Sequence, residues 1–256
     1  MAYFLRTGPS SYAPTEHVGG AWHPDQQHIG PALGLLLHVV EQDRDARRDD
    51  GLLPARLAWD IWGTVSMAEV ETSVEVLRAG RTVELVEATL RHAGRTVATL
   101  RAWLMRRADT TAVAGSHLVA VPPPDEVPAW DPTTRWGGGY IASAEVRRRE
   151  AEPGRAVVWV RTDVPLVDDE DVSRLAHRAA LLDIVNGMSV RADPQAVAFP
   201  NVDLTVHLLR EPVGEWLGFD VTVSFGPGGT GLTSSVLHDE TGPLGTTAQL
   251  LTVRPG

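Results

Sequence analysis

Residues 69–106 read EVETSVEVLRAGRTVELVEATLRHAGRTVATLRAWLMR. Apolar and polar residues alternate along three runs in this stretch, Glu69–Arg78, Arg81–Arg91 and Arg95–Arg106. A short turn containing Ala-Gly separates each run from the next. Alternation with a period of two is typical of half-buried strands, and short glycine-containing turns favour hairpins. The stretch therefore predicts an antiparallel meander of three strands.

A helical segment precedes this meander. The residues from His28 to Gln42 are mostly apolar, and Pro31 stands near their start. A helix tolerates proline there because its first N–H groups have no partner within the helix. A polar stretch, Asp43 to Gly51, and one more predicted strand, Leu57–Met67, connect this helix to the meander. The first half therefore predicts one helix followed by antiparallel strands.

The second half repeats this plan. Tyr140–Arg149 and Arg155–Arg161 have the pattern of strands. A second helix is predicted from Asp168 to about Asn186, with acidic residues at its start and Gly187 as its stop. Four further strands are predicted, at Val202–Leu209, Trp216–Phe225, Gly231–His238 and Gly245–Arg254.

The repeat also predicts how the 256 residues are organised. With an offset of 148 residues, Gly80 corresponds to Gly228 and Gly94 to Gly242, and these pairs fall at predicted turns. A helix followed by a meander, occurring twice, is what tandem duplication of one α+β unit produces. We therefore divide the chain into residues 1–107, a Pro/Gly-rich linker at 108–139, and residues 140–256. We expect the linker to be pinned to the surface by Trp130 and Trp136, and the two units to share one sheet.

Charge and composition exclude several classes of function. All 23 basic residues are arginine, and 33 acidic residues bring the formal net charge to −10, which argues against nucleic acid or an anionic membrane as a partner. Without lysine the chain has no amine nucleophile and no P-loop. Without cysteine it has no disulfide, thiol nucleophile or cysteine-based metal site. No apolar run approaches the roughly 20 residues of a membrane span, and the first residues lack the pattern of a secretory signal. We therefore expect a cytoplasmic protein.

The one candidate metal site is the loop from Glu16 to His28, which contains His17, His23 and His28. These histidines lack a compact ligand spacing and stand among glycines typical of a loop. We interpret the loop as the structural lead into the first helix. The sequence therefore predicts no metal and no cofactor.

Asp183 is the strongest local anomaly. The second predicted helix carries an apolar stripe at Val172, Leu175, Ala176 and Ala179, and Asp183 takes the next position on that stripe. A carboxylate placed there is partly desolvated, which raises its pKa and makes it a better base. The alternative is a structural carboxylate that ties the helix to a neighbouring backbone, and the pattern alone leaves both open.

Two amides stand out on predicted strands. Gln249 shares a strand face with Thr247 and Leu251, where a buried amide needs hydrogen-bond partners. Its counterpart at the 148-residue offset is Arg101, so the halves differ at this point. Asn201 begins a strand after Phe199-Pro200. The polar residues that follow it on the same face are interpreted as a solvated surface: Asp203, Thr205 and His207.

Several short segments carry a likeness through their order and spacing. They are Glu16-His-Val-Gly-Gly-Ala-Trp22 with Gln27-His-Ile-Gly-Pro31, Leu182-Asp-Ile-Val-Asn-Gly187, Asn201-Val-Asp203, Arg210-Glu-Pro212, Gly214-Glu-Trp216 and Thr247-Ala-Gln249. Together they resemble the acyl-CoA thioesterase II family over nearly the full length. The resemblance implies a tandem (double) hotdog fold, with a long helix on an antiparallel sheet in each half.

The resemblance also implies an activity and a set of site residues. Members of the family hydrolyse fatty acyl-CoA thioesters with a water held by an Asp, a Thr or Ser, and a Gln. These positions fall on Asp183, Asn201 and Gln249, with Asn201 a departure from the family pattern and Thr205 a less favoured substitute. The implied partner is acyl-CoA, and a homo-oligomer is expected because hotdog sheets commonly pair.

Two other functions stay open at this point. One is an acyl-CoA-binding protein that has lost catalysis, with Asn201 as the sign of that loss. The other is a hotdog hydratase or dehydratase acting on acyl thioesters, which needs a carboxylate paired with a histidine. The residue five positions after Asp183 is Met188 rather than His, which argues against hydratase or dehydratase activity.

Overall fold

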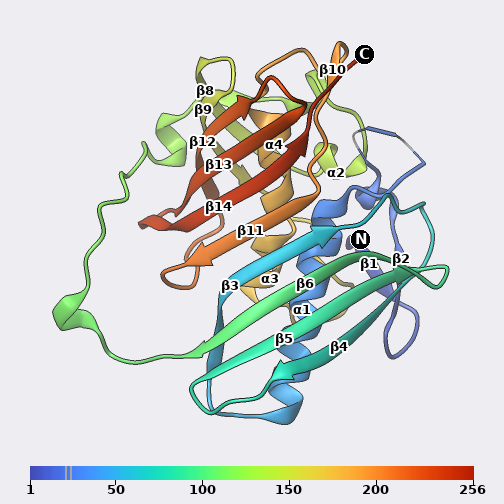
Figure 1. Ribbon diagram of the computed structural model, residues 1–256, viewed down its shortest axis with the longest axis vertical. Coiled ribbons are helices and arrows are strands. Elements are labelled where there is room, and N and C mark those ends of the chain that lie inside the picture. Colours follow the sequence, from blue (N-terminus) through green and yellow to red (C-terminus); the bar gives the residue numbers. More distant parts are fainter. Residues whose placement is uncertain (21, 24) are drawn as a thin grey trace.

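The computed structural model describes residues 1–20, 22–23 and 25–256 (Figure 1). The first half contains β1 (Phe4–Arg6), β2 (Ser11–Pro14), α1 (Ile29–Arg47), β3 (Leu52–Ile61), β4 (Val70–Arg78), β5 (Val83–His92) and β6 (Arg95–Arg106), with a 3-10 turn at Glu16–Val18. The predicted meander is confirmed as β4, β5 and β6. The first helix runs five residues beyond the predicted end, to Arg47, and so absorbs part of the predicted polar stretch.

The second half contains a similar set of elements. They are β7 (Ala129–Trp130), α2 (Gly139–Ala142), β8 (Glu145–Glu152), β9 (Arg155–Arg161), α3 (Arg174–Ala179), α4 (Val185–Met188), β10 (Val197–Ala198), β11 (Asp203–Leu208), β12 (Leu217–Phe225), β13 (Thr230–Asp239), β14 (Gly242–Thr252) and β15 (Arg254–Pro255). Short 3-10 turns lie at Thr111–Val113, Pro124–Glu126, Pro132–Thr134 and Leu182–Ile184, the last labelled η5. The strand predicted from Tyr140 begins only at Glu145, because residues 139–142 form the short helix α2.

Among the described residues, thirteen strands form one sheet, ordered β1-β2-β4-β5-β6-β3-β11-β14-β13-β12-β9-β8-β7. The halves join where β3 pairs antiparallel with β11, with Leu57 opposite Val206. The expected shared sheet is therefore confirmed. Helices α1 and α3 cover one face of it (Figure 1).

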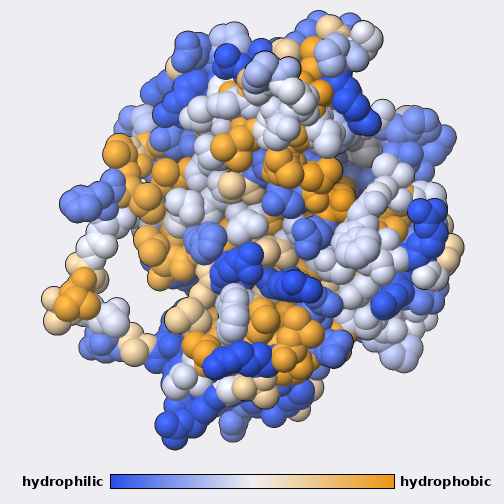
Figure 2. All heavy atoms as spheres, viewed as in Figure 1, coloured by the Kyte–Doolittle hydropathy of each residue, from blue (hydrophilic) through white to orange (hydrophobic). Residues whose placement is uncertain are grey.

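The core lies between this face and the helices. Every residue of α1 from Gly30 to Glu41 is buried, as expected for a helix that is apolar almost all round. Helix α3 packs against α1 at Gly34, where an added Cβ would lie 2.8 Å from the Cβ of Ala180. Glycine is required there because the two helices approach too closely for a side chain. The outer face of the sheet presents mixed hydrophilic and hydrophobic groups (Figure 2).

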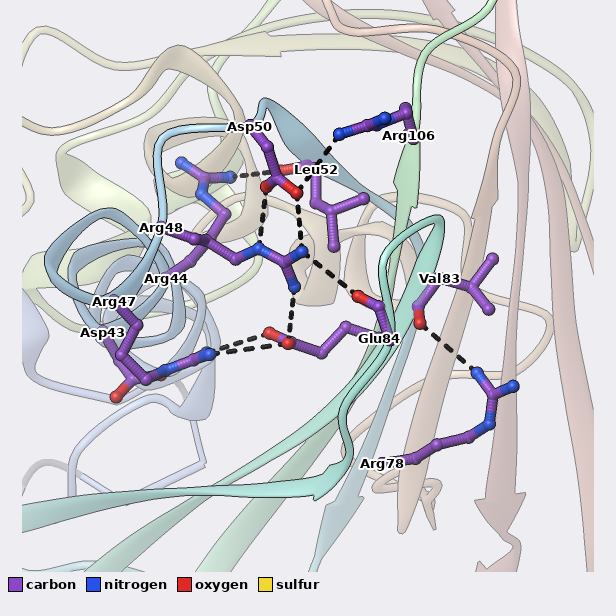
Figure 3. A network of polar contacts seen from close by, with 11 residues as sticks. Asp43, Arg44, Arg47, Arg48, Asp50, Leu52, Arg78, Val83, Glu84 and Arg106 are labelled. Atoms are coloured by element: carbon purple, nitrogen blue, oxygen red, sulfur yellow. Dashed lines mark hydrogen bonds and ion pairs between the residues drawn. The ribbon is translucent and has the colours of Figure 1, made fainter.

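A buried carboxylate fastens the end of α1 to the sheet (Figure 3). Glu84 on β5 is 2% exposed and accepts hydrogen bonds from Arg47 at 2.9 Å and from Arg48 at 2.6 Å. Arg48 also pairs with Asp50 at 2.7 Å. Because buried charges are tolerated only when paired, this network holds both partners in place.

The second helix is not the continuous helix that the sequence predicts. It begins only at Arg174, after Ser173 as N-cap, and it breaks after Ala179 into the turn η5 and the short helix α4. The residues of the expected first turn are not helical, because Glu170 among them binds Arg6 and His38 of the first half.

A side chain accounts for the break itself. The hydroxyl of Tyr140 donates to the carbonyl of Ala180 at 2.7 Å. That carbonyl would otherwise accept from Ile184, whose N–H bonds Leu181 in a 3-10 turn instead. A side chain that inserts into the ladder of helical hydrogen bonds is a common cause of a kink.

The last hairpin of each half carries a bulge at the same place. The register shifts between Leu90 and Arg91 in β5–β6, and between Leu237 and His238 in β13–β14. Leu90 and Leu237 are 147 residues apart. In these strands the repeat is therefore offset by 147 residues, and the expected 148 is wrong.

This one-residue difference changes which residues correspond, because a shift by one turns a strand residue to the other face. The structural counterpart of Gln249 is Ala102 rather than Arg101. Arg101 lies on the outer face and binds Glu87, whereas Gln249 is buried.

Residues 108–139 cross the surface and are held at several points. The indole of Trp136 donates to the carbonyl of Gly187 at 2.8 Å, and Arg148 stacks over Trp130. Trp159 donates to the carbonyl of Pro122 at 2.9 Å. The expected pinning by Trp130 and Trp136 is confirmed. Among the described residues, no helix is long and apolar enough to cross a membrane.

Candidate active site

Asp183 lies in the turn η5, where the broken helix passes over the inner face of the sheet. Asp183 is 4% exposed, and burial raises the pKa of its carboxyl group to about 6. Desolvation disfavours the charged form of a carboxyl group and so accounts for the direction of this shift. The sequence expectation of a partly desolvated carboxylate is confirmed.

Two amides hold one oxygen of this carboxylate. Asn201 Nδ2 donates to Asp183 Oδ1 at 2.6 Å, and Gln249 Nε2 donates to the same oxygen at 3.1 Å. The three residues come from η5, from the segment before β11, and from β14. These hydrogen bonds lower the pKa of Asp183 but leave it raised overall, because desolvation is the larger effect. The structure thus brings together all three residues named from the sequence.

The second carboxylate oxygen faces a histidine that sequence reasoning did not place at the site. His28 Nδ1 lies 3.6 Å from Asp183 Oδ2 and accepts a hydrogen bond from the N–H of Gly30 at 3.1 Å. Burial lowers the pKa of His28 to about 3, so the ring is neutral at physiological pH. The contact is therefore neither an ion pair nor a hydrogen bond, and Oδ2 has no hydrogen-bond partner among the described residues.

His28 also has a clear structural role. It is the N-cap of α1, and its ring stacks on Tyr140 with the ring centres 4.0 Å apart. The interpretation of its loop as a structural lead into the helix agrees with this arrangement. Among the described residues, no group of histidines and carboxylates is placed to hold a metal ion.

A cavity of about 490 Å³ opens beside this carboxylate at the junction of the halves. Asp183, Asn201 and His28 lie on its wall, and Gln249 lies behind Asp183 on the sheet. Its other lining residues include Trp22, His23, Ile29, Ile61, Trp62, Val65, Pro200, Val202, Thr252 and Arg254. A larger surface hollow of about 720 Å³, between residues 150–153 and 190–195, contains none of the three predicted site residues.

The polar residues that follow Asn201 do not join the site. Asp203 accepts a hydrogen bond from the N–H of Leu250 at 2.6 Å. Thr205 and His207 line a groove on the outer face of the sheet, so Thr205 cannot replace Asn201 beside Asp183. The preferred reading of these residues as a solvated face agrees with their positions.

Fold and site together define a hotdog-like protein with a single desolvated carboxylate at a cavity wall. Two family models match the chain: the acyl-CoA thioesterase N-terminal domain over residues 18–105 and the acyl-CoA thioesterase C-terminal domain over residues 118–253. We conclude that the chain belongs to the acyl-CoA thioesterase family and is a thioester hydrolase.

Solved structures show the same fold. A putative thioesterase from Novosphingobium aromaticivorans is similar with a TM-score of 0.74 and 21% identity, covering 99% of both chains. A hot dog fold protein of unknown function from Alicyclobacillus acidocaldarius has a TM-score of 0.74 and 17% identity, covering 98% of this chain and 96% of its own. A putative thioesterase II from Thermobifida fusca has a TM-score of 0.68 and 20% identity, covering 98% and 95%. A comparison with curated proteins found no match.

Proposed function

We propose that this protein hydrolyses fatty acyl-CoA to free acid and CoA by direct attack of a water molecule that Asp183 deprotonates. The observation that carries this proposal is the asymmetry of the carboxylate. Two amides fix Oδ1, whereas Oδ2 has no hydrogen-bond partner among the described residues, and Asp183 lines the cavity. A base with a pKa of about 6 is ionised at neutral pH and is stronger than an exposed aspartate.

The reaction then needs one water and no cofactor. The water oxygen attacks the thioester carbonyl carbon while its proton passes to Asp183 Oδ2. The carbonyl oxygen becomes an oxyanion, and backbone N–H groups near the start of α1 are the candidate donors to it. When the tetrahedral intermediate collapses, the C–S bond breaks and Asp183 returns the proton to the CoA thiolate.

The amides have positioning roles in this scheme. Asn201 and Gln249 orient Asp183 through their N–H groups. The carbonyl oxygen Oε1 of Gln249 is buried and has no hydrogen-bond partner among the described residues, so it can accept a hydrogen bond from the attacking water while the proton passes to Asp183. Asn201 replaces the Thr or Ser of the family pattern, and its amide supplies a donor to the carboxylate.

One observation bears on hydratase or dehydratase chemistry. His28 lies beside Asp183, as a carboxylate–histidine pair requires, although it does not follow Asp183 in sequence. Its Nδ1 already accepts from Gly30 and its pKa is about 3, so it is a poor proton donor. We therefore favour hydrolysis, and the loss of enoyl absorbance from enoyl-CoA would support the other reading.

The test is a thiol-release assay over acyl-CoA chains of increasing length. The proposal expects CoA release with saturated fatty acyl groups and no change in enoyl absorbance. Tight binding of acyl-CoA without thiol release would instead identify a binding protein that has lost catalysis.

We also propose that residues 1–107 and 140–256 are two hotdog units joined by residues 108–139, with the active site carried by the second. The matching bulges of the last hairpins support this division. Pairing of two chains through their sheets and a cytoplasmic location stay predictions.

A further inference from the structure

Four polar side chains form an island among apolar residues on the inner face of the second half. Thr233 and Ser235 on β13 stand opposite Gln249 and Thr247 on β14. All four are buried, with exposed fractions of 6% or less. The oxygens Thr233 Oγ1, Ser235 Oγ, Thr247 Oγ1 and Gln249 Oε1 have no hydrogen-bond partner among the described residues.

Apolar residues bound this island on every side of the sheet. Val223 and Val221 on β12 stand opposite Thr233 and Ser235, and Val206 on β11 stands opposite Thr247. The next inward pairs along the hairpin are Gly231 with Leu251 and Leu237 with Gly245. The residues around the island therefore supply no polar neighbour on the sheet from outside the island itself.

The fold does not demand polar residues at these positions. At the 147-residue offset the four counterparts form the same two cross-strand pairs, Val86 with Ala102 and Ala88 with Leu100. All four counterparts are buried and apolar. The first half thus shows that the hairpin packs well without hydroxyl groups. Because an unpaired buried hydroxyl costs stability, the island points to a polar partner that is bound during function.

The island is continuous with the active site, since Gln249 belongs to it and donates to Asp183. Two residues along a strand advance about 6.6 Å, so Ser235 and Thr247 lie within reach of a short acyl chain whose carbonyl is at Asp183. The segment that covers this part of the sheet is three short pieces, α3, η5 and α4, rather than one rigid helix. The cavity beside Asp183 is not lined by the island residues, so this cover has to shift for an acyl chain to reach them.

Resting on the proposed thioester hydrolysis, we infer that the preferred substrate is an acyl-CoA whose acyl chain carries a hydroxyl group on one of its first few carbons beyond the carbonyl. A substrate hydroxyl can donate to one of the island oxygens and accept from another, because Ser and Thr do both. A plain fatty acyl chain would leave these groups unpaired. A site built to bind a hydroxyl group discriminates strongly against the analogue that lacks it.

The experiment compares kcat/KM for 3-hydroxybutyryl-CoA with butyryl-CoA and for 3-hydroxyhexanoyl-CoA with hexanoyl-CoA, with the 3-keto analogues as a further arm. The wild type is expected to favour the hydroxy member of each pair by about tenfold or more. A preference for the keto analogues over the hydroxy members would overturn the assignment of a hydroxyl group.

The variants are Thr247→Val and Ser235→Ala, with Thr246→Val as the matched control because Thr246 lies next along β14 on the opposite face. Both island variants should bring the ratio of kcat/KM for the hydroxy substrate to that for the plain substrate close to one, largely by lowering kcat/KM for the hydroxy substrate. The control should keep the wild-type ratio. Thermal unfolding checks the fold, and the island variants should be at least as stable as the wild type. Ser235→Ala serves where Thr247→Val does not fold.

Further outcomes also overturn the inference. A wild-type ratio near one contradicts it, as does a ratio that the island variants leave unchanged. Equal losses on both substrates show instead that the island only holds water. Failure of the proposed hydrolysis is distinguishable, because the wild type would then release no thiol from any of these substrates, and the inference would fall with it.

Discussion

The side-chain nitrogen of Gln249 lies 3.1 Å from Oδ1 of Asp183, although the two residues are 66 positions apart and belong to different elements. The contact fixes the turn η5 against strand β14. Together with Asn201, it holds Oδ1 of the carboxylate, whereas Oδ2 has no hydrogen-bond partner among the described residues and belongs to a side chain on the cavity wall. A carboxylate held in this way is suited to accept a proton from one direction only.

Activity should depend on the ionisation of Asp183. Burial raises the pKa of this carboxyl to about 6, and only the ionised form accepts a proton. We expect kcat/KM to rise with pH and to reach half its plateau near pH 6. The measurement is thiol release between pH 4.5 and 8.5, and a flat profile across this range would show that another group is the base.

The ionisation of Asp183 should also make the stability of the protein depend on pH. The pKa of Asp183 in the folded state, about 6, exceeds the value of roughly 3.9 for an unfolded aspartate. Between these values the folded state binds more protons, so stability falls as pH rises through this window. Asp183→Asn lacks this titration, and its amide oxygen can still accept from both neighbouring amides.

We therefore expect the stability advantage of Asp183→Asn over the wild type to grow from about pH 4 to pH 6 and then to level off. Chemical denaturation at pH 4, 5, 6 and 7 measures it. Asp49→Asn, at an exposed position, should show no such change. An advantage that stays constant with pH would mean that Asp183 titrates alike in both states.

Gln249→Ala should shift the pH profile as well as the rate. The hydrogen bond from Gln249 lowers the pKa of Asp183, so its removal should raise that pKa and move the half-maximal point to higher pH. We expect kcat to fall at the same time, because the attacking water loses the hydrogen-bond acceptor Oε1 of Gln249. A lower rate with an unmoved pH profile would indicate a packing defect only.

Asn201 tests the departure from the family pattern. Asn201→Ala removes the 2.6 Å donor to Asp183 and should reduce kcat, whereas Asn201→Thr restores a hydroxyl donor at the same place. We expect Asn201→Thr to retain more activity than Asn201→Ala in thiol release. If the alanine variant is as active as the threonine variant, the side chain at this position does not orient Asp183.

Outside the site, substitution of Glu84 should lower the free energy of unfolding. Its buried carboxylate holds both Arg47 and Arg48 at the end of α1 (Figure 3). Glu84→Ala removes the shared partner of two arginines and should lower the free energy of unfolding by more than the loss of an exposed pair, although Arg47 keeps Asp43 and Arg48 keeps Asp50. Glu87→Ala, which removes a pair with the exposed Arg101, should cost under about 1 kcal/mol.

The meander and the burial of Asp183 could be predicted from the sequence because both depend on local patterns. Alternation marks a strand and an apolar stripe marks a buried helix face, whatever the rest of the chain does. Prediction from the sequence failed where a distant residue decides the outcome. The hydroxyl of Tyr140 breaks the second helix, and Arg6 and His38 bind Glu170, which the pattern had assigned to a helix start.

His28 and the polar island show the same limit. Nothing local to His28 indicates that the start of α1 meets Asp183, which lies 155 positions further along the chain. The glycines at the turns align the two halves one residue out of register in the last hairpin. With that alignment Gln249 corresponds to Arg101 on the outer face. In the structure it corresponds to Ala102, an apolar residue on the inner face.

The path of the oxygen distinguishes direct attack by water from attack by Asp183 itself. In a single turnover in H2(18)O, direct attack places the label in the released fatty acid. If Asp183 attacked the carbonyl and water then opened the anhydride at the Asp183 carbonyl, the first label would enter the Asp183 carboxylate. Opening at the acyl carbonyl would label the acid, and an acyl adduct on the peptide that contains Asp183 would reveal that path. Mass spectrometry of the acid and of the peptide that contains Asp183 measures both, and we expect label only in the acid.

The most direct test of the central claim is the rate of thiol release from a saturated acyl-CoA by Asp183→Asn beside the wild type, at pH 7.5, with both proteins shown to be folded. A general base contributes about 10²–10⁴-fold to a reaction rate. We predict that the variant is slower by at least about a hundredfold in kcat. Hydrolysis by Asp183→Asn at the wild-type rate would contradict the account.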